Sequence, residues 1–163
     1  RYGNVINSRG SVIPFFKRIL LEKNYFPVTD KEMTRFFMKV EDGVKFVLKS
    51  FERMYGGEIF IPKINSIKIL DIAKSIDPKA EIKIIGIRPG EKLHEILCPQ
   101  DEAHLTLEYK DYYMIKPSIG LDIENDYRKN LLGENGKPVF KNFEYSSLKN
   151  NFLSVSEIKK LIN

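Results

Sequence analysis

The sequence predicts an α/β fold, and three features of it carry that prediction. Between residues 58 and 97 a strand pattern, a helix pattern, a second strand pattern and a short helix pattern follow one another, which is the order typical of α/β proteins. Residues 40–54 give the clearest helix, because apolar side chains recur at steps of four and three. Hydrophobic residues make up 42% and charged residues 30% of the chain, so we expect a packed core and little disorder.

The first elements are a strand end, a helix and a short extended segment. Residues 1–6 (RYGNVI) lack an initial Met and are typical of the end of a buried strand, so we expect the chain to be a fragment of a longer protein. A helix is predicted from Ser11 to about Lys23, with the Ser11 side chain accepting a backbone N–H bond as its N-cap. Pro14 is tolerated in the first helical turn. Residues 26–29 are expected to be extended.

The middle of the chain alternates between helix and strand. After the helix at 40–54 we predict a strand over 58–61, and then a helix capped by Asn65 or Ser66. Residues 82–87 have a strand pattern and 92–97 a short-helix pattern, with a Pro-Gly turn between them. The stripe of the first of these helices consists of Val40, Val44, Val47, Phe51 and Met54, and the second helix should turn Ile69, Ile72, Ala73 and Ile76 inward.

The last third of the chain is predicted to be less regular. Residues 105–108 and 112–115 alternate as the two strands of a hairpin do. Residues 117–142 are rich in Asn, Gly, Lys and Asp without periodicity, so we expect a long surface loop. Ser154 and Glu157 have the spacing of a capping box before a final short helix that ends near residue 162.

Charge and cysteine content narrow the function classes. The chain has 27 Lys and Arg and 22 Asp and Glu, a net charge of +5, but the Lys residues are scattered, which favours a solvated surface over a nucleic-acid partner. Cys98 is the single cysteine and there are two histidines, so no internal disulfide and no metal cluster are expected, and a reducing cytoplasm is the default. Apolar runs are far shorter than the roughly 20 residues of a membrane span, so we expect no membrane partner.

The first candidate site is the segment from Asn4 to Pro14, which leaves a strand and enters a helix. Ligands bind at the carboxyl ends of strands in α/β sheets, and a helix start offers unpaired N–H groups to anions. Arg9 adds a fixed positive charge, Gly10 allows close approach of the backbone, and Asn4 can donate and accept at once. From the residues alone, a plain connecting turn is an equally good interpretation.

The second candidate site is the turn at residues 87–92. Arg88 presents a planar set of donors suited to a phosphate, and Glu91 could accept hydrogen bonds from a pair of sugar hydroxyls. The structural alternative is a surface turn that carries an Arg–Glu ion pair. His94 is expected on the helix that follows and is more typical of a surface or half-buried histidine than of a catalyst.

Two further features have simpler structural interpretations. Tyr109, Tyr112 and Tyr113 could stack on a base, but such a pattern more often packs one face of a sheet. Cys98 should behave as a small apolar residue.

Taken together, seven motifs resemble the C-terminal half of the inverting UDP-N-acetylglucosamine 4,6-dehydratases, which are extended short-chain dehydrogenase/reductases. The resemblance runs from residue 1 to the tail. It implies the end of a Rossmann sheet plus a smaller α/β substrate-binding lobe. The motifs are RYGNV at 1–5, SRGSVIP at 8–14, TD at 29–30, MTRF at 33–36, GEIFIP at 57–62, IIGIRPGEKLHE at 84–95 and YSS at 145–147.

The resemblance implies a lyase that acts on UDP-N-acetylglucosamine with NADP. In that family the cofactor takes a hydride from C4 of the sugar, water is eliminated across C5 and C6, the hydride returns to C6 and C5 is inverted. The nucleotide loop and the catalytic Tyr and Lys belong to the N-terminal half, so this chain is expected to be inactive alone and to hold NADP only in small part. The full-length protein is expected to be a homo-oligomer.

The same resemblance implies which residues touch the ligands. One departure from the family occurs at Ile6-Asn7, where relatives carry a small or flexible residue followed by Gly; Asn tolerates the positive φ that such a turn needs. The implied cofactor contact is Val5, and no catalytic residue is assigned to this chain. The implied substrate contacts are Asn4, Arg9, Gly10, Ser11, Val12, Ile13, Pro14, Thr29, Arg88 and Glu91. Of these, Arg9, Thr29, Arg88 and Glu91 should line one cleft.

Several alternatives stay open at this point. The closest subgroup begins pseudaminic acid synthesis for flagellin glycosylation, and capsule and O-antigen enzymes are the near alternative. Related nucleotide-sugar epimerases or reductases and a non-catalytic binding or assembly module are the rival functions. For domain organisation we expect residues 1–116 to mix the end of the Rossmann sheet with the substrate lobe, and residues 117–163 to form a C-terminal extension.

Overall fold

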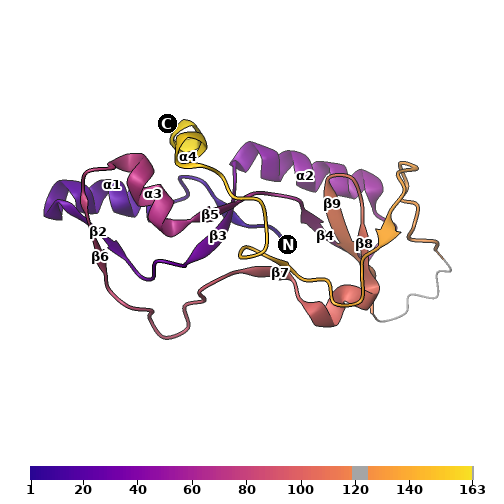
Figure 1. Cartoon of the computed structure of the whole chain (residues 1–163). Helices are drawn as coiled ribbons and strands as arrows, with labels where there is room; N and C mark the ends of the chain where they lie inside the picture. Colours follow the sequence, from indigo (N-terminus) through magenta and orange to yellow (C-terminus); the bar gives the residue numbers. More distant parts are fainter. Residues whose placement is uncertain (119–124, 163) are drawn as a thin grey trace. The chain divides into compact units, whose positions relative to one another are not determined.

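The computed structural model describes residues 1–118 and 125–162, which form two compact units (Figure 1). Unit 1 contains Arg1–Tyr2, Val40–Lys63 and Ile96–Ser146. Unit 2 contains Gly3–Lys39, Ile64–Glu95 and Ser147–Asn163. Each unit is therefore built from three separate segments of the chain. The expected division at residue 116 stays a prediction.

Unit 2 contains two small sheets. In the first, β3 (Thr34–Met38) lies between β1 (Asn4–Val5), to which it is parallel, and β5 (Ser66–Lys68), to which it is antiparallel. The second is a parallel pair of β2 (Tyr25–Val28) and β6 (Glu81–Ile84), with Phe26 opposite Ile82. Segments from three parts of the chain thus share one unit.

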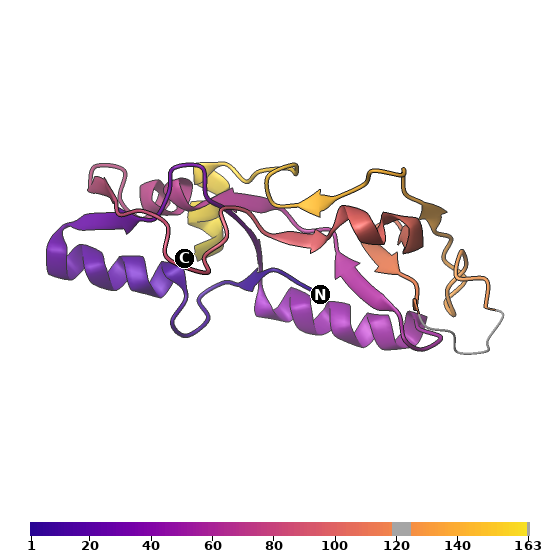
Figure 2. The same ribbon diagram turned by 90° about the horizontal axis from the view of Figure 1, so that it is seen from below.

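Three helices cover these strands. α1 (Val12–Lys23) packs beside β2, and α3 (Ile69–Ile76) packs beside α4 (Val155–Ile162), as Figures 1 and 2 show. Each helix turns apolar side chains into a common core, which is what their helical spacing predicts. Fully buried members of this core include Ile13, Phe16, Phe26, Val28, Ile72 and Ile158.

Unit 1 is built around a four-stranded antiparallel sheet in the order β10-β8-β9-β4. A separate antiparallel pair joins β7 and β11, and the unit also contains α2 and the short 3-10 helix η1. The bounds of these elements are α2 Val40–Arg53, β4 Ile59–Pro62, β7 Ile96–Cys98, η1 Gln100–Leu105, β8 Thr106–Glu108, β9 Tyr112–Ile115, β10 Lys137–Pro138 and β11 Tyr145–Ser146. None of the helices in the described ranges is long and apolar enough to cross a membrane.

The α/β prediction is confirmed, and so are three local ones. The predicted hairpin is β8 paired with β9, with Glu108 opposite Tyr113. Tyr109 and Tyr112 stack with their rings 4.5 Å apart, and both are buried, so they pack a face of the sheet. The capping box before α4 is present, because the backbone N–H of Ser154 donates to the Glu157 carboxylate over 2.8 Å.

Both predictions of side-chain N-caps earlier in the chain are wrong. Ser11 does stand at the N-cap of α1, but its side chain makes no capping hydrogen bond. Ser66 does not cap a helix, because it pairs with Phe36 in the β3–β5 ladder. α3 consequently begins at Ile69, after a strand that the sequence did not reveal.

The predicted helix at 92–97 is also wrong. In unit 2 the carbonyls of Lys92 and Leu93 accept hydrogen bonds from Arg35 over 2.7 and 3.1 Å, and the Leu93 carbonyl also accepts from the Thr34 N–H over 3.1 Å, so this segment is held by β3 and not by helical bonds. In unit 1, Ile96–Cys98 is strand β7, paired with β11. Pairing with distant segments has overridden a weak local helix pattern.

The predicted loop at 117–142 is more structured than expected where it is described. It contributes β10 to the main sheet of unit 1, and Asn130 within it is buried. Residues 119–124, which the prediction also covered, lie outside the described residues.

The apolar stripe of α2 lies at the surface of unit 1. The helix forms as predicted, but Val40, Val44, Val47 and Phe51 are each between 42% and 65% exposed. Phe51 is the most exposed of them at 65%. The sequence period therefore predicted the helix, but the stripe is not buried within this unit.

Candidate functional site

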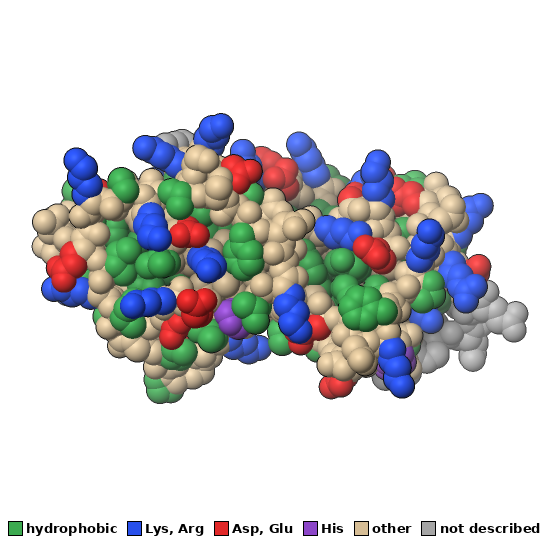
Figure 3. All heavy atoms as spheres, viewed as in Figure 1, with side chains coloured by type: hydrophobic (Ala, Val, Ile, Leu, Met, Phe, Trp, Pro, Cys, Tyr) green, Lys and Arg blue, Asp and Glu red, His purple; other side chains and the backbone are tan. Residues whose placement is uncertain are grey.

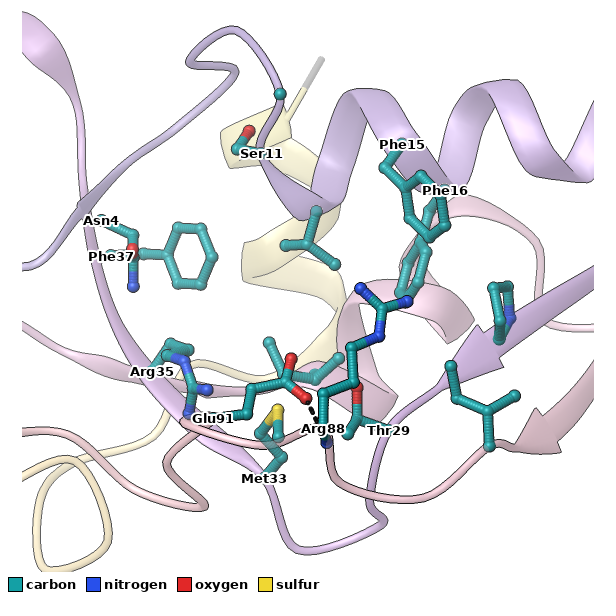
Figure 4. Close-up of a pocket in the computed structure, with 15 residues that line it drawn as sticks. Asn4, Ser11, Phe15, Phe16, Thr29, Met33, Arg35, Phe37, Arg88 and Glu91 are labelled. Carbon is teal, nitrogen blue, oxygen red and sulfur yellow. Dashed lines mark hydrogen bonds between the residues drawn. The ribbon is translucent and has the colours of Figure 1, made fainter.

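Unit 2 contains a cavity of about 330 Å³ where the loop after β1, the start of α1 and the turn after β6 come together. This volume lies at the lower end of the range for small-molecule sites. Figure 4 shows the residues around it. They are Asn4, Gly10, Ser11, Val12, Phe15, Phe16, Pro27, Thr29, Met33, Arg35, Phe37, Ile69, Ile85, Arg88 and Glu91.

The loop that leads into α1 is shaped by two residues with positive φ. Asn7 has a φ of 57° and Gly10 a φ of 78°, which is the left-handed region that Gly and Asn adopt most readily. The Ser11 N–H donates to the Ser8 carbonyl over 3.0 Å and closes the turn. The chain therefore reverses direction between the end of β1 and the start of α1, and Asn7 adopts the positive φ that this turn needs.

At the start of α1, the Ser11 hydroxyl is a polar group left without a partner. Its Oγ is buried and makes no hydrogen bond in the described chain. A buried polar atom without a partner is uncommon and costs about 1–3 kcal/mol. Because Ser11 lines the cavity at a helix N-terminus, a ligand oxygen could satisfy this hydroxyl and interact with the helix dipole.

The turn after β6 carries Arg88 and Glu91. The Glu91 N–H donates to the Arg88 carbonyl over 3.0 Å, and the Glu91 carboxylate accepts from the Arg88 backbone N–H over 3.1 Å. The carboxylate thus bonds the backbone and not the guanidinium, and Arg88 has no ion-pair partner among the residues that the structure describes. Figure 4 shows the Arg88 side chain extending from the turn toward Phe15 and Phe16. An Arg–Glu ion pair, the structural alternative considered above, is not formed.

The opposite wall is formed by Asn4 and Arg35. Asn4 Nδ2 donates to both oxygens of Glu95, over 3.1 and 3.2 Å. The Arg35 guanidinium is fixed by the backbone carbonyls of Thr34, Leu93 and Lys92 and lies 3.6 Å from Glu95. Sequence reasoning did not select Arg35 or Glu95 as site residues, although both lie inside motifs that carry the family resemblance.

The structure brings together most, but not all, of the residues predicted to bind substrate. Asn4, Gly10, Ser11, Val12, Thr29, Arg88 and Glu91 line the one cavity. Arg9 is exposed and does not line it, so the expected meeting of Arg9 with Thr29, Arg88 and Glu91 is wrong for Arg9. Pro14 is not among the lining residues either, and Ile13 packs into the core with 1% of its surface exposed.

The remaining candidates lie outside this cavity. Val5 pairs with Met38 in the β1–β3 ladder and does not line the cavity. His94 is half-buried, and its Nδ1 lies 2.8 Å from the Thr34 hydroxyl, in a loop and not on the predicted helix. In unit 1, burial raises the pKa of the Cys98 thiol, which fits a small buried residue.

Charged side chains are dispersed over one face of the protein. Figure 3 shows Lys and Arg side chains spread over the face in view and mixed with Asp and Glu, without a single basic patch. This arrangement differs from the concentrated basic face of a nucleic-acid binder.

A model of the family described as polysaccharide biosynthesis protein matches residues 1–117. The chain belongs to this family. Its mixed α/β structure also has a close counterpart in a crystal structure, that of Pen from Bacillus thuringiensis, with a TM-score of 0.80 and 29% identity. That similarity covers 99% of this chain and 47% of the other.

Two sequence relatives are informative. The chain is 55% identical to a UDP-N-acetylglucosamine 4,6-dehydratase (inverting) from Campylobacter jejuni serotype O:2, over 100% of this chain and 50% of that protein. It is 38% identical to a UDP-glucose 4-epimerase from Rickettsia conorii, over 99% of this chain and 48% of that protein. The chain therefore spans about half the length of the curated relatives that it matches.

Proposed function

We propose that this chain is the substrate-binding half of an inverting UDP-N-acetylglucosamine 4,6-dehydratase, and that the cavity in unit 2 holds the UDP-sugar. One observation carries the proposal: two segments about 75 residues apart, at 10–12 and 88–91, line the same cavity. One segment supplies the Ser11 hydroxyl and the other the Arg88 guanidinium, and among the described residues the first has no hydrogen-bond partner and the second no ion-pair partner. The 55% identity to the Campylobacter dehydratase supports this choice of substrate.

Different residues of the cavity would bind different parts of the UDP-sugar. Arg88, the Ser11 hydroxyl and the start of α1 offer positive charge and donors, which suit a diphosphate. Glu91 has a carboxylate oxygen beyond the one bonded to the backbone, which suits ribose hydroxyls. Phe15, Phe16 and Phe37 supply apolar walls. These residues bind and orient the ligand, and they perform no bond-making step.

In this proposal the chain contributes only a small part of the NADP site. NADP supplies the hydride that is removed from and returned to the sugar when the complete enzyme works. Val5, the cofactor contact that the family resemblance implies, lies in β1 beside Met38 of β3, and its side chain would approach the nicotinamide end of NADP. In this proposal NADP is held mainly by a part of the enzyme that this chain does not contain, and the enzyme is a cytoplasmic homo-oligomer of the pseudaminic acid pathway.

Calorimetric titration of the 163-residue chain with UDP and with UDP-N-acetylglucosamine tests the proposal. We expect both to bind, and Arg88→Ala to weaken both by about 10-fold or more, because the lost guanidinium contact to phosphate is charge-assisted. Arg128→Ala is the matched control, since Arg128 is exposed and does not line the cavity in unit 2. No heat with either ligand, or equal losses in both variants, would contradict the proposal.

A second candidate function is epimerisation of a UDP-sugar. The Rickettsia relative named UDP-glucose 4-epimerase favours it at 38% identity. Product analysis of the full-length protein separates the two, because a dehydratase yields a 4-keto-6-deoxy sugar and an epimerase yields a sugar of unchanged mass. Added to NADP and UDP-N-acetylglucosamine, the chain alone should give no product.

A further inference from the structure

We propose that Glu95 is a positioning residue, which fixes the Asn4 side chain so that Asn4 offers the bound ligand a hydrogen-bond acceptor and not a donor. Glu95 itself is not among the residues that line the cavity, whereas Asn4 is. The inference rests on the proposed function for the identity of the ligand. The orientation of Asn4 can be tested without any ligand.

The Asn4 side chain donates to both carboxylate oxygens of Glu95. Asn4 Nδ2 lies 3.1 Å from Oε1 and 3.2 Å from Oε2 of Glu95, and 3.4 Å from the Phe36 carbonyl oxygen. All three partners of this nitrogen are acceptors, so the nitrogen must be the amide donor. The amide carbonyl Oδ1 has no partner within the described chain.

Glu95 is itself held at both its backbone and its side chain. Its N–H donates to the Ser147 hydroxyl over 2.9 Å, and its carbonyl accepts from the Ser147 N–H over 2.8 Å. The carboxylate also accepts from the Phe36 N–H over 3.2 Å and lies 3.6 Å from Arg35 Nε. A carboxylate restrained in this way sets the position of the Asn4 amide.

The fixed orientation of the Asn4 amide decides which ligand groups it can bind. A free asparagine amide can rotate by half a turn and exchange its donor and acceptor. Asn4 cannot do so without breaking two bonds to a charged group, and such bonds are stronger than neutral ones. Asn4 Oδ1 therefore suits a hydroxyl or N–H donor of the ligand and disfavours a phosphate oxygen. This places the sugar or ribose hydroxyls, and not the diphosphate, beside Asn4.

The first test observes Asn4 in the 163-residue chain without ligand. We expect Glu95→Gln to shift the two side-chain N–H resonances of Asn4 in a ¹⁵N-labelled sample, because the charged acceptor is lost. Glu58→Gln is the matched control. The Glu58 carboxylate likewise accepts N–H hydrogen bonds, two from the backbone and each of 2.7 Å, but Glu58 lies in unit 1. Unchanged Asn4 resonances in Glu95→Gln would overturn the inference.

The second test measures whether Glu95 acts through Asn4. We expect Glu95→Ala to weaken binding of UDP-N-acetylglucosamine by about 10-fold and Glu95→Gln by less, since Gln retains one acceptor oxygen. In the Asn4→Ala background, Glu95→Ala should cost less than about 2-fold, because contacts in one network are not additive. An equal loss in both backgrounds would assign Glu95 a merely structural role. Absence of binding by the unmodified chain would contradict the proposed function, while the resonances of Asn4 would still decide the positioning.

Discussion

Arg53 and Glu134 face each other along two parallel hydrogen bonds in unit 1. Arg53 Nε donates to Oε2 over 2.8 Å and Nη2 donates to Oε1 over 3.1 Å. The Arg53 side chain is 1% exposed, and its guanidinium lies 4.2 Å from the centre of the Tyr112 ring. The only buried guanidinium in the described core is thus held by a carboxylate from the segment that the sequence predicted to be a surface loop.

Removal of the Glu134 charge should destabilise the protein. We expect Glu134→Gln to lower the free energy of unfolding by about 2 kcal/mol, because the buried Arg53 guanidinium then keeps only Asp111 as an ionised partner. The loss is smaller than for a fully buried pair, since the Glu134 side chain is 35% exposed. Urea unfolding measures it. Glu81→Gln, which breaks an exposed pair with Lys83, should change the free energy by less than about 0.5 kcal/mol.

The same pair predicts a pH dependence. The hydrogen bonds from Arg53 hold the pKa of the Glu134 carboxyl below its ordinary value. The unfolded chain therefore takes up this proton at a higher pH than the folded protein. The stabilisation is complete above the unfolded pKa of about 4.3 and is lost as pH falls through the lower folded pKa. Urea unfolding from about pH 6 to about pH 3 should show a shallower decline in Glu134→Gln; equal slopes would contradict this.

Two serines at helix starts should respond in opposite ways. Ser154 accepts and donates within a capping box, whereas the Ser11 hydroxyl is buried without a partner. We expect Ser154→Ala to cost about 1 kcal/mol of stability and Ser11→Ala to cost none or to stabilise slightly. In the proposed function, Ser11→Ala should still weaken UDP binding. A stability loss for Ser11→Ala equal to that for Ser154→Ala would show that the Ser11 hydroxyl has a structural partner.

Gly3 and Gly136 lie so close to neighbouring residues that neither position has room for a side chain. A Cβ at Gly3 would lie 2.5 Å from the Phe36 Cβ, and one at Gly136 would lie 2.5 Å from the Tyr109 ring. Both Gly→Ala variants should lose about 1–3 kcal/mol of stability through overpacking. Only Gly3→Ala should also weaken UDP-sugar binding, because Gly3 precedes Asn4 at the cavity wall. Calorimetry on both variants, at a temperature where each is folded, would separate the two effects.

The exposed apolar stripe of α2 should bind small hydrophobic molecules. Phe51 is 65% exposed and lines a second, apolar cavity in unit 1 with Phe46 and Phe60. We expect Phe51→Gln to lower the fluorescence of a bound hydrophobic dye with little change in stability, since large apolar patches bind apolar molecules. Leu21→Gln is the control, because Leu21 is 89% exposed but does not line that cavity. Equal effects of the two variants would show that the stripe is not the binding surface.

The sequence predicted what depends on neighbouring residues. The periods of α1 and α2, the β8–β9 hairpin and the capping box of α4 are all encoded within about 15 residues. The features that were mispredicted depend on distant partners. Ser66 pairs with Phe36, the carbonyls of Lys92 and Leu93 bond Arg35, and Glu134 bonds Arg53. No local pattern contains that information.

The candidate site likewise combines residues that the local sequence could identify with residues that it could not. Asn4, Ser11, Arg88 and Glu91 could be selected because their residue types and turns suit an anionic sugar ligand. Arg35 and Glu95 could not be selected in this way, because their part in the site depends on contacts across 59 and 91 residues, from Glu95 to Phe36 and to Asn4. Arg9 was selected for its charge and for its place in the motif at 8–14, but its side chain is exposed and lies outside the cavity.

The interleaving of the two units has a consequence for synthesis on the ribosome. The chain passes from one unit to the other after Tyr2, Lys39, Lys63, Glu95 and Ser146. No single peptide bond can therefore be cleaved to release either unit whole. During translation, α3 lacks its packing partner until α4, which lies much later in the sequence, has been synthesised. Unit 2 should thus remain protease-sensitive until α4 has left the exit tunnel, because non-local contacts close late in folding.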